Sequence, residues 1–137
     1  MPDFRLKSVQ DGNPVNSKNF LGRVTVVAFF SPWCSDCVSE IGMLQKLLDA
    51  RPGEFSVIGM AVVNRETNDK LKPFIEELGL KLPVVISNAV LEKAFGGIII
   101  VPTAYLIDET GRIARKFIRH LTQDRLSPAL DLLLQQR

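Results

Sequence analysis

Two cysteines are the residues of this chain best suited to chemistry, and the chain has no others. They stand at Cys34 and Cys37 with two residues between them. One helical turn carries the second cysteine beneath the first, within reach of a disulfide. In such a pair the first sulfur attacks a foreign disulfide as a thiolate and the second sulfur resolves the mixed disulfide. The spacing therefore predicts a dithiol switch, with an exposed nucleophile at Cys34 and a deeper partner at Cys37.

The surrounding residues predict that this pair lies where a buried strand turns into a helix. Val24–Phe30 is a β-branched and aromatic run that Ser31-Pro32 ends, and a helix is predicted from about Cys34 to Ala50. Its apolar face consists of Val38, Ile41, Leu44 and Leu48. A helix start presents unpaired N–H groups and the positive end of the macrodipole, which stabilise an anion. Thiols in C-x-x-C motifs at such places ionise well below the value of about 8.5 for free cysteine.

Other uses of two close cysteines fit less well. A closed zinc site needs four ligands, and His120 is the only histidine. Haem attachment requires histidine after the second cysteine, where Val38 stands. A static disulfide closing so short a loop constrains the unfolded chain little. We therefore expect redox chemistry without a metal or an organic cofactor, and a structural or solvated role for His120.

Four motifs spread over nearly the whole chain resemble the thioredoxin superfamily, and more narrowly its TlpA-type thiol–disulfide oxidoreductases. They are Pro2-Asp3-Phe4-Arg5-Leu6 with Gly22-Arg23, Trp33-Cys34-Ser35-Asp36-Cys37-Val38-Ser39-Glu40, Val101-Pro102-Thr103, and Leu106-Ile107-Asp108-Glu109-Thr110-Gly111-Arg112. The resemblance implies an α/β thioredoxin-like fold, a central mixed sheet with helices on both faces. It also implies an extra helix–strand insertion before Pro102. We expect residues 1–137 to form a single domain of this kind, as a monomer.

The resemblance also implies supporting residues around the two cysteines. Pro102 is expected in the cis form facing the disulfide, which leaves the backbone of Val101 free to pair with an extended substrate strand. Trp33 is expected to shield the thiol and offer a flat surface to a substrate, the alternative being a place in the core. Glu40 is expected to tune the thiols or move protons, the alternative being a solvated helix glutamate.

Asp36, between the cysteines, suggests the direction of electron flow. A carboxylate near Cys34 disfavours its thiolate and hence the reduced form, so the chain is predicted to be a reductant. The alternative is that Ser35 and Asp36 are simply favourable residues for a first helical turn.

The remaining patterns predict further strands and helices. Strands are expected at Asp3–Val9, Phe55–Val63, Pro83–Ser87, Thr103–Ile107 and Arg112–Ile118, and helices from Thr67 or Asn68 to Leu78, at Ala89–Phe95 and after Thr122. Ser17 is expected to cap a short turn through Phe20.

Composition narrows the partners. Seventeen basic against fifteen acidic side chains give a net charge of +2, too balanced to indicate a nucleic-acid or membrane surface, and no apolar run is long enough for a membrane span. We expect protein disulfides or thiols as substrates, apocytochrome c being one candidate, and an upstream thiol reductant. The resemblance favours an extracytoplasmic location over a cytoplasmic one.

Two rival functions remain. A peroxiredoxin-like peroxidase requires a threonine or serine three residues before its reactive cysteine and a proline four residues further back. Ser31 meets the first requirement, but Val27 stands at the proline position. A non-catalytic thioredoxin-fold module, such as a copper metallochaperone, lacks a suitable histidine.

Overall fold

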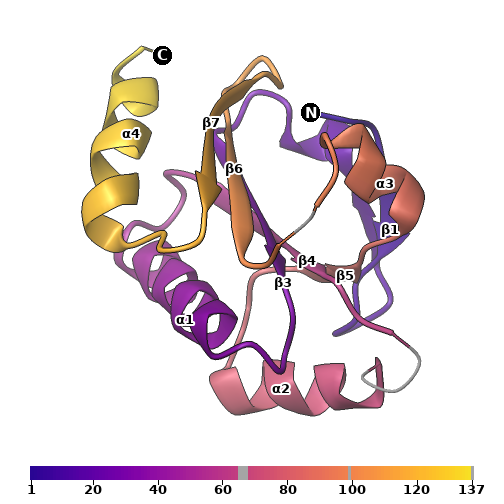
Figure 1. The fold of residues 1–137 in the computed structure, drawn as a ribbon. Coiled ribbons are helices and arrows are strands. Elements are labelled where there is room, and N and C mark those ends of the chain that lie inside the picture. Colours follow the sequence, from indigo (N-terminus) through magenta and orange to yellow (C-terminus); the bar gives the residue numbers. More distant parts are fainter. Residues whose placement is uncertain (65–67, 99, 137) are drawn as a thin grey trace.

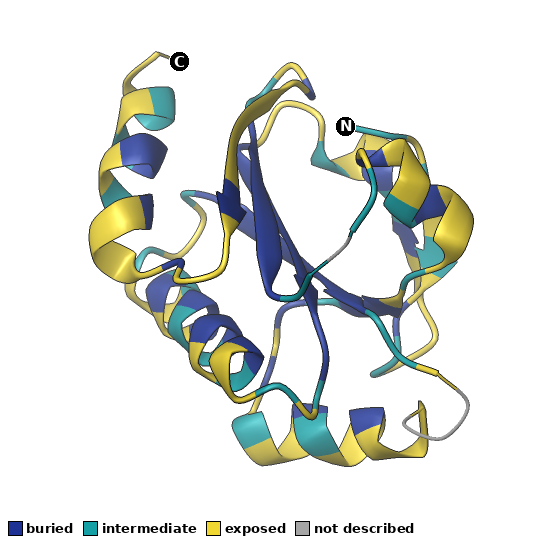
Figure 2. Ribbon diagram, in the orientation of Figure 1, coloured by how far each residue is buried: buried dark blue, intermediate teal, exposed yellow. Residues whose placement is uncertain are grey.

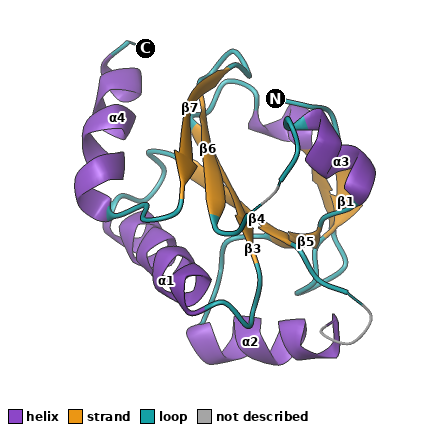
Figure 3. Cartoon of the chain, viewed as in Figure 1, coloured by secondary structure: helices purple, strands orange, loops and turns teal. Residues whose placement is uncertain are grey.

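The computed structural model describes residues 1–64, 68–98 and 100–136. Its centre is a mixed sheet of five strands, which lies between the helices (Figures 1 and 3). The strand order is β5-β4-β3-β6-β7. Strands β3, β4 and β5 are parallel, whereas β6 is antiparallel to both β3 and β7. Their bounds are Thr25–Phe30 for β3, Ser56–Ala61 for β4, Val84–Ile86 for β5, Thr103–Ile107 for β6 and Ile113–Ile118 for β7. Every residue of the central strand β3 is buried.

Helices cover one face of the sheet, while a helix and a small hairpin cover the other (Figures 1 and 2). The first face packs against α1 (Ser35–Ala50), α2 (Leu71–Leu78) and α4 (Gln123–Gln135). The second face packs against α3 (Ala89–Ala94) and the N-terminal hairpin. Successive side chains of a strand point to opposite faces, so Val26 and Phe30 enter the first core and Val27 and Phe29 the second. The thioredoxin-like fold with helices on both faces is thus confirmed.

The N-terminal segment differs from its prediction. The expected strand shortens to β1 (Arg5–Lys7), which pairs antiparallel with β2 (Pro14–Asn16), a strand that was not predicted. The short 3₁₀ turn η1 (Ser17–Phe20) is capped by Asn16 rather than Ser17, because the Asn16 side chain accepts from the N–H of Lys18. A three-residue strand with one buried side chain carries too little periodicity to be recognised.

The segment between β4 and Pro102 contains α2, β5 and α3. A 3₁₀ turn, η2 (Asn68–Lys70), leads into α2, and the predicted cap at Thr67 lies outside the described residues. Pro73 falls in the first turn of α2, where a helix does not require its N–H. Gly79 ends α2 with a φ of 62°. Thr122 is the N-cap residue of α4, although its side chain makes no capping hydrogen bond. None of the described helices is both long and apolar enough to cross a membrane.

Candidate active site

Cys34 lies at the amino end of α1, directly after the loop that leaves β3. It is the N-cap residue of the helix, and its Sγ accepts a hydrogen bond from the N–H of Cys37 at 3.2 Å. Its carbonyl accepts the first helical bond, from the N–H of Val38 at 3.1 Å. A thiolate here receives an orphan helix donor directly and lies at the positive end of the helix dipole. The local geometry predicted from sequence is therefore present, with both cysteines as free thiols.

Cys37 lies behind Cys34, in the core between α1 and the sheet. It is fully buried and belongs to the first hydrophobic cluster, whereas Cys34 is half-buried at its edge. Burial raises the pKa of the Cys37 thiol far above its usual range, and the side chain of Cys34 and the charge of Glu40 raise it further. Its surroundings therefore favour the protonated form of the Cys37 thiol.

Glu40 is buried one helical turn beyond Cys37. Its side chain is 5% exposed, and Oε1 has no hydrogen-bond partner among the described residues. Burial raises the pKa of Glu40 from 4.5 to about 7; the charge of Arg125 opposes this rise and that of Asp36 adds to it. The solvated alternative is wrong for this glutamate. Arg125 on α4 was not singled out in the sequence, because no local pattern relates it to α1.

The loop before β6 lies against Cys34. The Val101–Pro102 peptide bond is cis, as the resemblance implied, and Pro102 is buried. The Cys34 thiol points at the carbonyl of Val101, with 3.9 Å between Sγ and O. The Thr103 hydroxyl donates to the carbonyl of Ile100 at 2.7 Å and so anchors the entry to β6. Residues far apart in sequence thus meet at one sulfur.

Trp33 projects beside Cys34 and is 57% exposed, so the alternative of a core residue does not hold. It lines a pocket of about 440 Å³ together with Pro32 and with Phe74 and Glu77 of α2. Asp36 is exposed in the first turn of α1. His120 is exposed too, in the turn between β7 and α4, where it lines a small pocket with Glu40.

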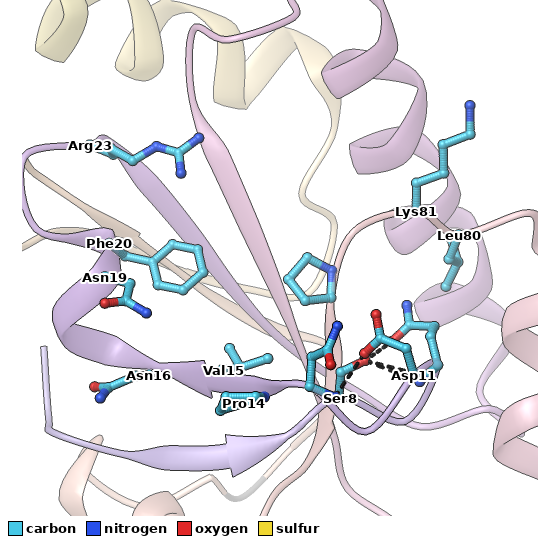
Figure 4. A pocket seen from close by; sticks show the side chains of 13 residues that line it. Ser8, Asp11, Pro14, Val15, Asn16, Asn19, Phe20, Arg23, Leu80 and Lys81 are labelled. Carbon is cyan, nitrogen blue, oxygen red and sulfur yellow. Dashed lines mark hydrogen bonds between the residues drawn. The ribbon is translucent and has the colours of Figure 1, made fainter.

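A larger hollow, of about 560 Å³, lies elsewhere, beside the N-terminal hairpin (Figure 4). Its lining includes Ser8, Phe20, Arg23 and Leu80, and neither cysteine borders it. Arg23 precedes β3, whereas Cys34 follows it, so this hollow lies at the end of β3 away from the dithiol. It does not contribute to the chemistry described above. The described residues also contain no cluster of three or more His, Cys, Asp or Glu side chains suited to a metal ion.

Comparison with known proteins decides the family. Residues 1–133 match the Redoxin family. The chain belongs to this family. It is 30% identical to sporulation thiol-disulfide oxidoreductase A of Bacillus subtilis (strain 168), over 90% of this chain and 74% of that protein. It is 28% identical to the thiol-disulfide oxidoreductase ResA of Bacillus thuringiensis (strain Al Hakam), over 91% of this chain and 71% of that protein.

A solved structure extends this relationship to three dimensions. The chain superimposes on a thiol:disulfide interchange protein of the thioredoxin family from Chlorobium tepidum TLS with a TM-score of 0.85 and 27% identity. The match covers 97% of this chain and 94% of that one. The resemblance read from the motifs is confirmed: this Redoxin-family chain is a thiol–disulfide oxidoreductase of TlpA-like type.

Proposed function

We propose that the chain exchanges electrons with protein disulfides through Cys34 and Cys37 and acts as a reductant. One observation carries this proposal: Cys34 Sγ caps α1 and accepts the N–H of Cys37, while the thiol of Cys37 is buried directly behind it. The arrangement supplies one accessible nucleophile and one protected resolving thiol. No metal or organic cofactor takes part.

The reaction has two steps that balance in electrons. The Cys34 thiolate attacks one sulfur of the substrate disulfide, forms a mixed disulfide, and the other substrate sulfur leaves as a thiolate. Cys37 then loses its proton and attacks Cys34 Sγ, which forms the Cys34–Cys37 disulfide and releases the second substrate thiolate. The substrate gains two electrons and the protein loses two. An upstream thiol protein must reduce the chain again.

Glu40 is proposed as the group that accepts the proton of Cys37. Its carboxylate acts electrostatically on that thiol, and its pKa of about 7 allows it to take up and give up protons near neutral pH. Oε1 has no hydrogen-bond partner among residues 1–64, 68–98 and 100–136, and this supports the role, since such an oxygen can receive a proton.

The substrate surface is proposed to comprise Trp33, Val101 and Pro102. An extended substrate segment would pair with the backbone of Val101, next to the sulfur that it must meet. The exposed indole of Trp33, the residue before Cys34, offers apolar area to the same substrate. These residues would place the substrate disulfide next to Cys34.

The reducing direction is proposed from Asp36, whose carboxylate in the first turn of α1 disfavours a thiolate nearby. Equilibration with a thiol redox buffer measures the potential. A value well below that of the strong periplasmic oxidant, about −120 mV, is expected, and a value as high as that one would contradict the reductant role.

The setting of the activity is also proposed. The family resemblance supports a monomeric single domain that works outside the cytoplasm, with apocytochrome c as one candidate substrate. Fractionation of the native host and the size of the purified chain in solution test these two points.

Reduction of insulin by the purified chain tests the proposed chemistry. We expect Cys34→Ser to abolish the reaction, and Cys37→Ser to stop it after the first step and retain substrate as a mixed disulfide. Trapping with Cys37→Ser in the native host would name the substrate. Equal insulin reduction by wild type and Cys34→Ser would contradict the proposal.

The structure weakens the peroxidase alternative. The Ser31 hydroxyl is buried and donates to the carbonyl of Val62 at 2.8 Å, so that donor is not directed at a peroxide on Cys34. We expect hydrogen peroxide consumption to be slow compared with insulin reduction.

A further inference from the structure

The turn between β7 and α4 has an unusual backbone. Arg119 and His120 have φ values of 57° and 51°, so two successive residues with side chains adopt the left-handed region. L-residues avoid this region because Cβ approaches the following carbonyl oxygen too closely. Two in a row persist only where the surrounding structure holds them.

Arg125, in the first turns of α4, holds this turn. Its Nη1 donates to the carbonyl of His120 at 2.9 Å and to that of Arg119 at 3.3 Å. Its guanidinium also lies over the ring of Phe117, 5.4 Å from the ring centre. On the other side of the turn, the N–H of Arg119 donates to the carbonyl of Pro102 at 2.9 Å. The turn is thus tied to both α4 and the cis-proline loop.

The same turn forms one wall of the pocket that reaches Glu40. This pocket, of about 250 Å³, lies between α1 and the start of α4, and Glu40 and His120 both line it. It brings solvent near a carboxyl group that is otherwise buried and whose Oε1 has no partner among the described residues. A proton on Glu40 can therefore exchange with solvent through this pocket, beside the turn.

The charges around Glu40 come from three elements. Asp36 of α1 and His120 of the turn line the same pocket as Glu40, Cys37 of α1 feels its charge, and the charge of Arg125 acts on it from α4. Burial and Asp36 favour the protonated form of Glu40, whereas the charge of Arg125 favours the carboxylate and lowers its pKa. Arg125 is the permanently charged cation of this set.

We propose that Arg125 is a positioning residue for the dithiol exchange, clamping the Arg119–His120 turn and directing a positive charge at Glu40. Resting on the proposed role of Glu40, the inference is that Arg125 keeps this carboxyl able to accept the proton of Cys37 at neutral pH. Without the guanidinium, Glu40 would remain protonated to a higher pH and the attack of Cys37 on the mixed disulfide would slow.

Two charge variants and one matched control test this inference. Arg125→Gln removes the charge, Arg125→Lys retains it, and Arg115→Gln removes a guanidinium that also lies over Phe117, 5.1 Å from its centre. The titration of Glu40 is followed by NMR of ¹³C-labelled glutamate, its signal being assigned by loss in Glu40→Gln. The rate of the resolving step is measured against pH by rapid mixing with a small aromatic disulfide.

Arg125→Gln is expected to move the midpoint of Glu40 upward by about half a pH unit or more, because an opposite charge has been lost. The pH profile of the resolving rate should move with it, which for a half-unit shift is an approximately twofold loss at pH 7 that approaches about threefold below pH 6. Arg125→Lys should lie between Arg125→Gln and wild type, and Arg115→Gln should match wild type. An unchanged midpoint in Arg125→Gln, or an equal shift in Arg115→Gln, would overturn the inference.

A glycine background covers the case in which Arg125→Gln does not fold. Glycine adopts the left-handed region readily, so His120→Gly relieves one of the two left-handed residues and lowers the turn's need for a clamp. It also removes the imidazole, and a further shift on adding Arg125→Gln then comes from Arg125 alone. If the midpoint shifts while Glu40→Gln resolves as fast as wild type, the proton role proposed for Glu40 is wrong, although Arg125 does act on that carboxyl. The two failures are therefore distinguishable.

Discussion

Helix α1 carries two buried polar side chains, Glu40 and Gln45, that differ in how far their hydrogen-bonding groups are satisfied. Glu40 is 5% exposed and Gln45 is 7% exposed, so they are buried almost equally. Gln45 Oε1 accepts the N–H groups of Lys81 and Leu82 at 2.8 and 3.0 Å, and its Nε2 donates to Asp49 at 3.1 Å. Glu40 Oε1 has no hydrogen-bond partner in the described part of the chain, and burial raises the pKa of this carboxyl to about 7.

The difference follows the position of each side chain along the sheet. Gln45 lies deep in α1 and supports the chain that enters β5, at the end of the sheet away from the cysteines. A buried amide that satisfies its partners stabilises the fold, while a buried carboxyl without partners costs stability. The cost falls beside Cys37, where the proposed mechanism transfers a proton. The comparison indicates that the buried polar group beside the two cysteines lowers the stability of the fold, whereas the one at the opposite end of the sheet raises it.

The largest expected effect on stability is at Gln45, whose hydrogen bonds are satisfied. Gln45→Ala leaves two backbone N–H groups without their acceptor and should lower the free energy of unfolding by about 3 kcal/mol. Lys46→Ala, at an exposed neighbouring position, is the control and should change little. Chemical denaturation measures both. Insulin reduction per folded molecule should stay at the wild-type value, and a loss below about 1 kcal/mol would contradict the support assigned to Gln45.

Glu40→Gln should act in the opposite direction and only at higher pH. The folded state raises the pKa of Glu40 from 4.5 to about 7, so it binds the proton more tightly than the unfolded chain does. This contribution to stability is complete below pH 4.5 and is lost as the pH rises to about 7. At pH 8 the variant should be more stable than wild type by roughly 2 to 3 kcal/mol.

Near pH 4 the two proteins should differ little, since the carboxyl group is then protonated in both states. Denaturation of both at a series of pH values checks this difference. A constant difference across the series would mean that burial does not penalise the carboxylate.

A smaller effect is expected from Gln10, which supports the same end of the sheet as Gln45. Its Nε2 donates to the carbonyl of Leu82 at 2.7 Å and its Oε1 accepts the N–H of Val84 at 3.1 Å. Gln10→Ala should cost about 1 to 2 kcal/mol, because this side chain is only half-buried and water can replace part of its bonding. Thermal unfolding measures the loss, and Gln10→Glu, which keeps one acceptor, should recover part of it.

The smallest effect on stability is expected at Trp33, beside Cys34. Trp33 is 57% exposed, so Trp33→Ala should change the free energy of unfolding by less than about 0.5 kcal/mol. If the indole contacts the substrate, KM for insulin should rise several-fold while reaction with a small disulfide is unchanged. Equal losses with both substrates would place Trp33 outside the substrate surface.

The sequence by itself determined the local arrangement around the cysteines. A buried run that ends at Ser31-Pro32, followed by apolar residues at helical spacing, was sufficient to place Cys34 at a helix start. The same periodicity predicted α2 and the strand pair after Pro102. These features depend on neighbours within one or two turns, so they can be read along the chain. The 3-residue strand β2 was missed because it is too short to show a period.

Only the tertiary structure decided the environment of the site. Three features depend on how α1, β7 and α4 pack together. They are the burial of Glu40, the left-handed turn at His120 and the action of the Arg125 charge on Glu40. In the sequence, Gln45 and Glu40 are both ordinary polar residues of one helix. Only in the fold does the segment that leads into β5 lie beside Gln45 and bond to its side chain. Electrostatics and hydrogen bonding sum over groups distant in sequence, and for that reason no local pattern could have distinguished the two.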